Sequence, residues 1–357
     1  MRIRKMRFVL FAPPEGVSNS SYASTHQNLA RGLSAHGHKV LLLESQRSYR
    51  GISDLERCFK NQVKEAEFVL FGSHLPGGSA IAEWLFATTH GAVGFYDTDT
   101  PATLARLDRG EIEYVNRRLI PRFELYLSSV GGPILGHIEE RYGAKHARAF
   151  YGSIDPTQIF GDHLPPRWDL GYTGPCSGDC RPVLEGLLVE PARKHVRGRF
   201  MVAGQPAPGG RPWPANIECI QPPAPGSHRA IYNVQRFALN VTPRDRFRAG
   251  FCPSVGLFEA AACGVPVITD FWRGMDEFME PRNEILVAHS PEDTLDYLLR
   301  LREPERRRIG QMARLRVLAE HTIERRSEQL EYYAQELVGT GRTATPSAHQ
   351  TLSGYAN

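Results

Sequence analysis

The segment 252–270 combines a helix start with an acidic side chain, a pattern that suits a phosphorylated ligand. A helix is expected to begin at Ser254, directly after Pro253. The first amides of a helix have no intrahelical partners and carry the positive end of its dipole, so Pro253, Ser254 and Val255 are predicted to bind phosphate. Glu259 lies about one and a half turns along this helix, where its carboxylate can accept hydrogen bonds from a ribose diol.

A basic cluster, formed by Arg244, Arg246 and Arg248, directly precedes this segment and follows a strand predicted at Phe237–Val241. Guanidinium groups bind phosphates in a bidentate manner, so Arg246 or Arg248 is a candidate clamp for a diphosphate. The alternative is a solvated basic loop without a ligand.

Three titratable residues in the first half of the chain are candidates for a general base. Asp97 and Asp99 follow a strand predicted at Ala92–Tyr96, and one of them can take a proton from a hydroxyl while the other caps the next helix. His26 lies in the first turn of a helix predicted at Tyr22–His36. For His26 the alternative is a surface histidine without a role in chemistry.

Small residues follow the strand predicted at Asp169–Thr173. Thr173 and Gly174 would let a diphosphate or a sugar approach the backbone, although a purely structural turn is an equal alternative. Cys176 and Cys180 are the only closely spaced cysteines, and neither a second pair nor a histidine pair completes a zinc site. We therefore predict no metal site.

Strands and helices alternate along most of the chain, which predicts parallel sheets with helices on both faces. In residues 1–150, strands are predicted at Arg7–Ala12, Lys39–Glu44, Phe68–Gly72, Ala92–Tyr96 and Leu125–Ser128, with helices at Tyr22–His36, Ile81–Thr88 and Ile134–Tyr142. In residues 151–338, strands are predicted at Asp169–Thr173, Phe200–Ala203, Phe237–Val241, Val265–Thr269 and Ile285–Ala288. Helices are predicted there at Pro182–Ala192, His228–Asn233, Ser254–Cys263, Pro291–Arg302, Glu305–His321 and Ile323–Leu337. Two doubly wound α/β domains result, with a Thr-, Ser- and Gly-rich tail at 339–357 that is expected to be disordered.

Composition limits the classes of partner. The 357 residues are 41% hydrophobic and 23% charged with a net charge of +4, which suits a phosphorylated small molecule and does not favour a nucleic-acid partner. The six cysteines are scattered, so a reducing cytoplasm is the expected location. No apolar run is long enough to span a bilayer.

The sequence Glu259-Ala-Ala-Ala-Cys-Gly-Val-Pro-Val-Ile268 resembles the nucleotide-sugar motif of GT-B-fold glycosyltransferases of the family 4 type. Four further stretches resemble the CgeB-like (spore-maturation) glycosyltransferases: Phe95–Pro101, Ile154–Pro156, Asp169–Gly174 and His321–Arg326. The resemblance implies two Rossmann-like domains facing a cleft. It also implies transfer of a sugar from a nucleoside diphosphate (NDP) sugar to a hydroxyl of a small-molecule or glycan acceptor, with neither a metal nor a cofactor. The family's ribose-binding glutamate corresponds to Glu259, and its diphosphate-binding loop to Pro253, Ser254 and Val255.

The chain departs from this family at one position. The family motif has a second glutamate, facing the donor sugar, where this chain has Phe251. Asp97-Thr98-Asp99 also spells the D-x-D pattern of metal-dependent GT-A enzymes, but the downstream motif favours the metal-independent GT-B fold. Two alternatives remain open: a nucleotide-sugar 2-epimerase on the same fold, and a non-catalytic nucleotide-sugar-binding protein.

Overall fold

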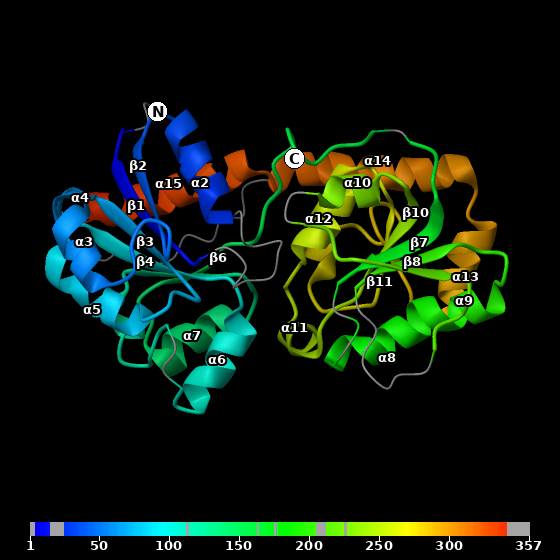
Figure 1. The fold of residues 1–357 in the computed structure, drawn as a ribbon, viewed down its shortest axis with the longest axis horizontal. Coiled ribbons are helices and arrows are strands. Elements are labelled where there is room, and N and C mark those ends of the chain that lie inside the picture. Colours follow the sequence, from blue (N-terminus) through cyan, green and yellow to red (C-terminus); the bar gives the residue numbers. More distant parts are fainter. Residues whose placement is uncertain are drawn as a thin grey trace.

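The computed structural model describes residues 4–14, 25–111, 114–162, 164–174, 176, 178–204, 212–224 and 227–340. Over these residues the chain forms two α/β domains that lie side by side (Figure 1). Each is built on a six-stranded sheet. The prediction of two doubly wound domains is therefore confirmed.

The N-terminal sheet has the strand order β2-β1-β3-β4-β5-β6, and all neighbouring strands are parallel. Its strands are β1 (Arg7–Ala12), β2 (Lys39–Glu44), β3 (Phe68–Gly72), β4 (Ala92–Asp97), β5 (Leu125–Ser128) and β6 (Ala147–Ala149). All five residues of β3 are buried, because helices cover both faces of this sheet. The strand order reverses between β1 and β3, so the loops after these two strands flank a crevice at the carboxyl edge.

The helices of the N-terminal domain are α2 (Thr25–Ala35), α3 (Ile52–Cys58), α4 (Lys60–Glu65), α5 (Gly78–Thr88), α6 (Thr100–Asp108) and α7 (Ile134–Tyr142). Leu55, Ile81 and Leu104 represent the apolar core on one face, which is covered by α3 to α7. Leu29 and Leu33 of α2 belong to the core on the opposite face.

The C-terminal sheet has the strand order β12-β11-β10-β7-β8-β9, again with parallel neighbours. Its strands are β7 (Trp168–Thr173), β8 (Phe200–Ala203), β9 (Ile217–Ile220), β10 (Gln235–Asn240), β11 (Val267–Thr269) and β12 (Leu286–Val287). The chain starts in the centre with β7, builds outward to β9 and then continues from β10 on the other side of β7. The strand order therefore reverses between β7 and β10, where doubly wound sheets bind ligands.

Helices cover both faces of the C-terminal sheet. They are α8 (Arg181–Leu184), α9 (Glu190–Lys194), α10 (His228–Tyr232), α11 (Arg244–Ala249), α12 (Val255–Ala262), α13 (Pro291–Arg300) and α14 (Glu303–Glu320). Helices α8, α9 and α13 pack into the core on one face of the sheet through Leu184, Ala192 and Leu298. Helices α10, α12 and α14 contribute to the core on the other face. A π-helical turn, Glu185–Val189, joins α8 to α9 within the single helix predicted from the sequence.

The last helix, α15 (Ile323–Thr340), packs on the N-terminal domain, although the sequence analysis groups it with the C-terminal half. Leu330 and Ala334 lie in the same core cluster as Leu29 and Leu33. Glu331 receives hydrogen bonds from the side chains of two histidines in the turn before β2. In Figure 1, α14 (orange) lies along the upper edge of the C-terminal domain, and α15 (red) continues from it across the N-terminal domain.

The chain crosses between the domains twice, and the two crossings pair with each other. Ile154 N donates to His321 O at 2.9 Å, and Ile323 N donates to Ile154 O at 2.9 Å. Asp155 forms an ion pair with Arg31 of α2 at 2.7 Å. Two of the stretches singled out in the sequence, Ile154–Pro156 and His321–Arg326, therefore form the connection between the domains.

Several short elements have no clear signal in the sequence and were not predicted. β6 and β9 carry little apolar pattern, and the basic segment after β10 forms helix α11 rather than a loop. Residues 341–357 of the predicted tail lie outside the described residues. Within the described ranges, no helix has both the length and the apolar character needed to cross a membrane.

Candidate active site

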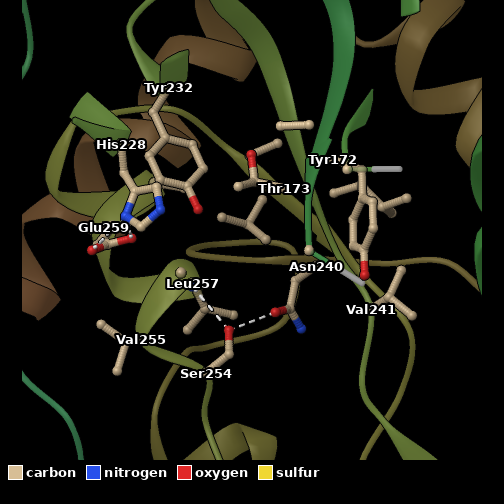
Figure 2. Close-up of a pocket in the computed structure, with 18 of the residues that line it drawn as sticks. Tyr172, Thr173, His228, Tyr232, Asn240, Val241, Ser254, Val255, Leu257 and Glu259 are labelled. Atoms are coloured by element: carbon tan, nitrogen blue, oxygen red, sulfur yellow. Dashed lines mark hydrogen bonds and ion pairs between the residues drawn. The ribbon is translucent and has the colours of Figure 1, made fainter. Parts of the chain in front are cut away.

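A cavity of about 520 Å³ lies at the carboxyl edge of the C-terminal sheet. Its wall includes the residues that end β7, β8 and β10 and the first turns of α12. The cavity therefore occupies the point where the strand order reverses, as expected for a nucleotide site in a doubly wound domain. Figure 2 shows the side chains that converge on it.

Helix α12 opens onto this cavity with a well-formed N-cap. Ser254 is extended (φ −79°, ψ 149°), and its hydroxyl oxygen accepts a hydrogen bond from Leu257 N at 3.0 Å. The same hydroxyl donates to Asn240 Oδ1 at 2.6 Å, which ties the helix start to the end of β10 (Figure 2). The amides of Val255 and Gly256 have no intrahelical acceptors and line the cavity, so they can bind an anion.

Gly256 was not recognised in the sequence. A Cβ atom at this position would lie 3.0 Å from Tyr232 Oη and 3.9 Å from Ser254 Oγ. Because the glycine has no side chain, the backbone of the first turn of α12 stays accessible to a ligand.

Glu259 points from α12 toward His228, the first residue of α10 (Figure 2). His228 Nδ1–H donates to Glu259 Oε1 at 3.3 Å, and Oε2 lies 3.2 Å from the same nitrogen but accepts no hydrogen bond from the described residues. Burial lowers the pKa of His228, but the hydrogen bond and the negative charge of Glu259 outweigh it, so the pKa is raised overall. Burial and the same carboxylate hold the pKa of Tyr232 well above its usual value. The buried glutamate thus keeps one carboxylate oxygen without a hydrogen-bond partner among the described residues.

Thr173 and Gly174 also line the cavity, as predicted. The buried Thr173 Oγ1 has no hydrogen-bond partner within the described chain. Gly174 has φ +159°, and a Cβ atom there would lie 2.6 Å from Tyr172 Oη. The small residues at the end of β7 therefore leave space at this end of the cavity, beside a buried hydroxyl group without a hydrogen-bond partner in the described chain.

The three arginines lie in helix α11 and point in different directions. Arg246 lines the cavity and lies 3.9 Å, Nη2 to Oδ1, from Asp99 of the N-terminal domain. Arg244 and Arg248 are exposed and do not line the cavity. The structure therefore brings only Arg246 of this cluster to the cavity.

Asp97, the last residue of β4, is completely buried. Its Oδ1 accepts hydrogen bonds from Thr103 Oγ1 at 2.7 Å and Asp99 N at 3.2 Å, and Tyr126 Oη donates to Oδ2 at 2.5 Å. Burial raises the pKa of Asp97 to about 6, although these hydrogen bonds oppose the shift. This aspartate holds the start of α6 to β5 and does not face the cleft.

Asp99 is the N-cap residue of α6, but its side chain makes no capping hydrogen bond. The carboxylate is 36% exposed and faces Arg246 across the space between the domains. Of the two aspartates, Asp99 is therefore the one that a substrate can reach.

His26 is buried in the first turn of α2 rather than exposed at the surface. Its ring lies 5.6 Å from the ring of Tyr96, and neither ring nitrogen has a hydrogen-bond partner within the described ranges. Burial lowers the pKa of His26 to about 4, so the imidazole is neutral at pH 7. His26 could act as a general base on a substrate only if its imidazole ring became accessible.

Pro253 and Phe251 lie beside the cavity without lining it. Pro253 is buried and precedes the N-cap of α12. Phe251 has a positive φ of 48° and packs against the Gly132 turn of the N-terminal domain. Its carbonyl accepts a hydrogen bond from Gly131 N at 3.0 Å. The position where the resembling family has a sugar-facing glutamate is therefore an interdomain contact in this chain.

Sequence reasoning missed two further polar groups. Asn240 supports the N-cap of α12 and donates from Nδ2 to Thr269 Oγ1 at 2.9 Å. Asp270 accepts hydrogen bonds from the amide and hydroxyl of Thr242, and burial raises its pKa to about 6. Asn240 lies at the end of a predicted strand and Asp270 directly follows another, and this placement at strand ends is the signal that could have identified them. Among the described residues, no three His, Cys, Asp or Glu side chains come together as metal ligands would.

Comparisons with known proteins agree with this architecture. Residues 181–332 match the family model described as "Glycosyl transferase-like". No curated protein matches the sequence.

Solved structures share the overall fold at low sequence identity. Sucrose-phosphate synthase from Thermosynechococcus elongatus is 13% identical with a TM-score of 0.63, covering 94% of this chain and 100% of that chain. HepE of Anabaena in complex with UDP-glucose is 11% identical with a TM-score of 0.63, covering 92% and 100%. An alpha-glucosyltransferase in complex with UDP and a 13-mer DNA containing a HMU base is 12% identical with a TM-score of 0.66, covering 94% and 100%.

The family 4 or CgeB-like subtype suggested by the sequence is not resolved by these matches. The coarser assignment is shown: the chain has the GT-B fold and carries a glycosyl transferase-like domain over residues 181–332.

Proposed function

We propose that the protein is a glycosyltransferase that moves a sugar from an NDP-sugar to a hydroxyl of an acceptor. One observation carries this proposal: a buried glutamate, one of whose oxygens has no hydrogen-bond partner among the described residues, lines a cavity at the strand-order reversal together with the first turn of a helix. Glu259 would accept hydrogen bonds from the ribose, and the amides of Val255 and Gly256 would bind the diphosphate.

Charge stabilisation at the diphosphate explains how this site would act. When the bond between the anomeric carbon and the diphosphate breaks, negative charge builds on the leaving group. The N-terminal end of α12 and the guanidinium of Arg246 are placed to stabilise that charge. With these two positive groups the proposed reaction needs neither a metal nor a cofactor. Asp99 is the group that can take the acceptor proton in an inverting reaction.

UDP-glucose is the first donor to test, because two of the similar structures contain UDP or UDP-glucose. Thermal-shift measurements with UDP, ADP, GDP and dTDP would identify the base, since a ligand of the native state raises the unfolding temperature. Glu259→Gln should weaken binding of the best diphosphate about tenfold or more, the scale of hydrogen bonds to a charged group. Glu305→Gln, an exposed and ion-paired glutamate of α14, is the matched control and should leave binding unchanged. Equal binding by Glu259→Gln and the parent would refute this ribose site.

Turnover separates transfer from the alternatives. Release of the diphosphate should depend on an acceptor, tested with simple alcohols, saccharides and hydroxymethylated DNA. An isomerised donor formed without acceptor would instead indicate the 2-epimerase. Binding without turnover across the panel would indicate a non-catalytic binding protein. Neither alternative is favoured by the comparisons.

A further inference from the structure

One ion pair connects the donor cavity with the N-terminal domain. Arg246 Nη2 lies 3.9 Å from Asp99 Oδ1, and the two side chains are 12% and 36% exposed. Arg246 belongs to α11 and lines the cavity, whereas Asp99 precedes α6 on the opposite side of the cleft. The pair is therefore shielded from water more than a surface salt bridge, but it is not sealed in a core.

Contacts between the two domains fix the position of the backbone around this ion pair. Helix α11 packs on α6, and the turn after α11 docks on the N-terminal domain through the hydrogen bond from Gly131 N to Phe251 O at 3.0 Å. Cys252 Sγ also donates to Ser129 O at 3.8 Å. Arg246 is thereby presented to Asp99 and to the donor cavity at the same time.

Within the described residues, the Asp99 carboxylate is not used to cap a helix. Its side chain does not cap α6, and the amide of Asp99 is bound by Asp97 instead. Among the residues described, Arg246 is the cation within 4 Å of this carboxylate. Asp99 can act as a base only when its carboxylate is not engaged by a guanidinium.

We propose that the diphosphate of the donor takes Arg246 away from Asp99, so that donor binding activates the base. This inference rests on the proposed function. A diphosphate carries more negative charge than one carboxylate and accepts bidentate hydrogen bonds, so it competes effectively for the guanidinium. The acceptor proton then moves to Asp99 as the acceptor oxygen bonds to the anomeric carbon. The bond from that carbon to the diphosphate breaks, and its electron pair leaves on the diphosphate that Arg246 holds.

If the diphosphate replaces Asp99 as the partner of Arg246, removing the charge of Asp99 should strengthen donor binding. Asp99→Asn should tighten UDP binding about threefold to tenfold, because the donor no longer competes with a carboxylate for Arg246. The same substitution should lower turnover strongly, so affinity and rate move in opposite directions. Uridine, which has no diphosphate, should bind the variant and the parent equally.

A double-mutant cycle tests the exchange by calorimetry with UDP. Arg246→Gln should weaken binding, and adding Asp99→Asn to it should give no tightening. Asp54→Asn is the matched control, because Asp54 is a half-buried, ion-paired aspartate of α3 far along the chain from the site. It should leave UDP affinity unchanged.

The outcomes separate this inference from the proposed function. If the parent binds UDP but Asp99→Asn binds it no more tightly, the exchange is wrong and the donor site stands. If Asp99→Asn tightens binding equally with and without Arg246, simple repulsion explains the gain and the exchange is again wrong. If the parent binds none of the nucleoside diphosphates, the donor site itself fails.

Discussion

His228 Nδ1 lies within 3.3 Å of both carboxylate oxygens of Glu259, and both side chains are buried at the wall of the donor cavity. Helices α10 and α12 are brought together by this contact, so the acid proposed to hold the ribose is also part of the packing of the C-terminal domain. A change at His228 should therefore affect both the stability of this domain and ligand binding.

The raised pKa of His228 predicts the sign of a pH effect. A histidine whose pKa is higher in the folded state contributes stability that is complete below the unfolded pKa of about 6.5 and is lost as the pH rises through the folded pKa. Replacing His228 with Gln keeps a neutral donor but removes this titration. The free energy of unfolding of the parent should exceed that of His228→Gln by about 1 kcal/mol more at pH 6 than at pH 8. Denaturant titrations at both values measure it, and a larger gap at pH 8 would contradict the assignment.

Asp97 and Asp99 should behave differently when each is substituted. Asp97 accepts three hydrogen bonds, two of them buried, so Asp97→Ala leaves Thr103 and Tyr126 without this acceptor. We expect a loss of about 2–4 kcal/mol in the free energy of unfolding. Asp99→Ala removes no capping hydrogen bond and should cost less than about 1 kcal/mol. Thermal unfolding of both variants checks this, and an equally mild effect of both would show that Asp97 does not organise the turn.

Gly256 allows binding and stability to be separated. Alanine can be accommodated in the helix at this position. Its Cβ would lie 3.0 Å from Tyr232 Oη, so only a small shift of the tyrosine side chain is needed. Gly256→Ala should therefore leave stability unchanged or raise it by up to about 1 kcal/mol. The added methyl group enters the turn that the diphosphate must approach, so UDP binding should weaken about tenfold.

Gly136→Ala in α7 is the control for this prediction, since nothing lies within 4 Å of its Cβ position and the site is in the other domain. It should show the helix gain without the loss of binding. Unchanged UDP affinity in Gly256→Ala would place the diphosphate away from the first turn of α12.

Local rules were enough to predict the start of α12 and the place of Glu259 on it. Ser254 as N-cap and Glu259 on the following helix lie in one short segment, so spacing alone places them. His228 could not be assigned in this way, because it lies 31 residues before Glu259 and meets it only through packing of α10 on α12. The separation of Arg246 from Arg244 and Arg248 likewise depends on the helical phase of α11, which the sequence suggested was a loop.

The strands and helices of the fold also differ in how well local sequence predicts them. Buried parallel strands such as β1 and β3 have continuous apolar runs and were predicted with the observed bounds. The edge strand β9 exposes Glu218 and Cys219, so it has no such run and was missed. Helix α15 packs on the N-terminal domain through contacts between residues far apart in the chain, and the local periodicity of the sequence does not predict such contacts.

Phe251 gives a final test, because the resembling family has a donor-facing glutamate at its position. The ring lies against Gly132 of one domain and Gly274 of the other, where added Cβ atoms would come within 2.3 Å and 2.2 Å of it. Phe251→Ala should lower the free energy of unfolding by about 1–3 kcal/mol through lost packing. Because φ is +48°, Phe251→Gly should be less destabilising than Phe251→Ala by about 0.5–1 kcal/mol, even though glycine is smaller. Neither variant should change UDP affinity more than about twofold, since the ring does not line the donor cavity. Loss of UDP binding in a variant of parental stability would instead place this ring against the donor.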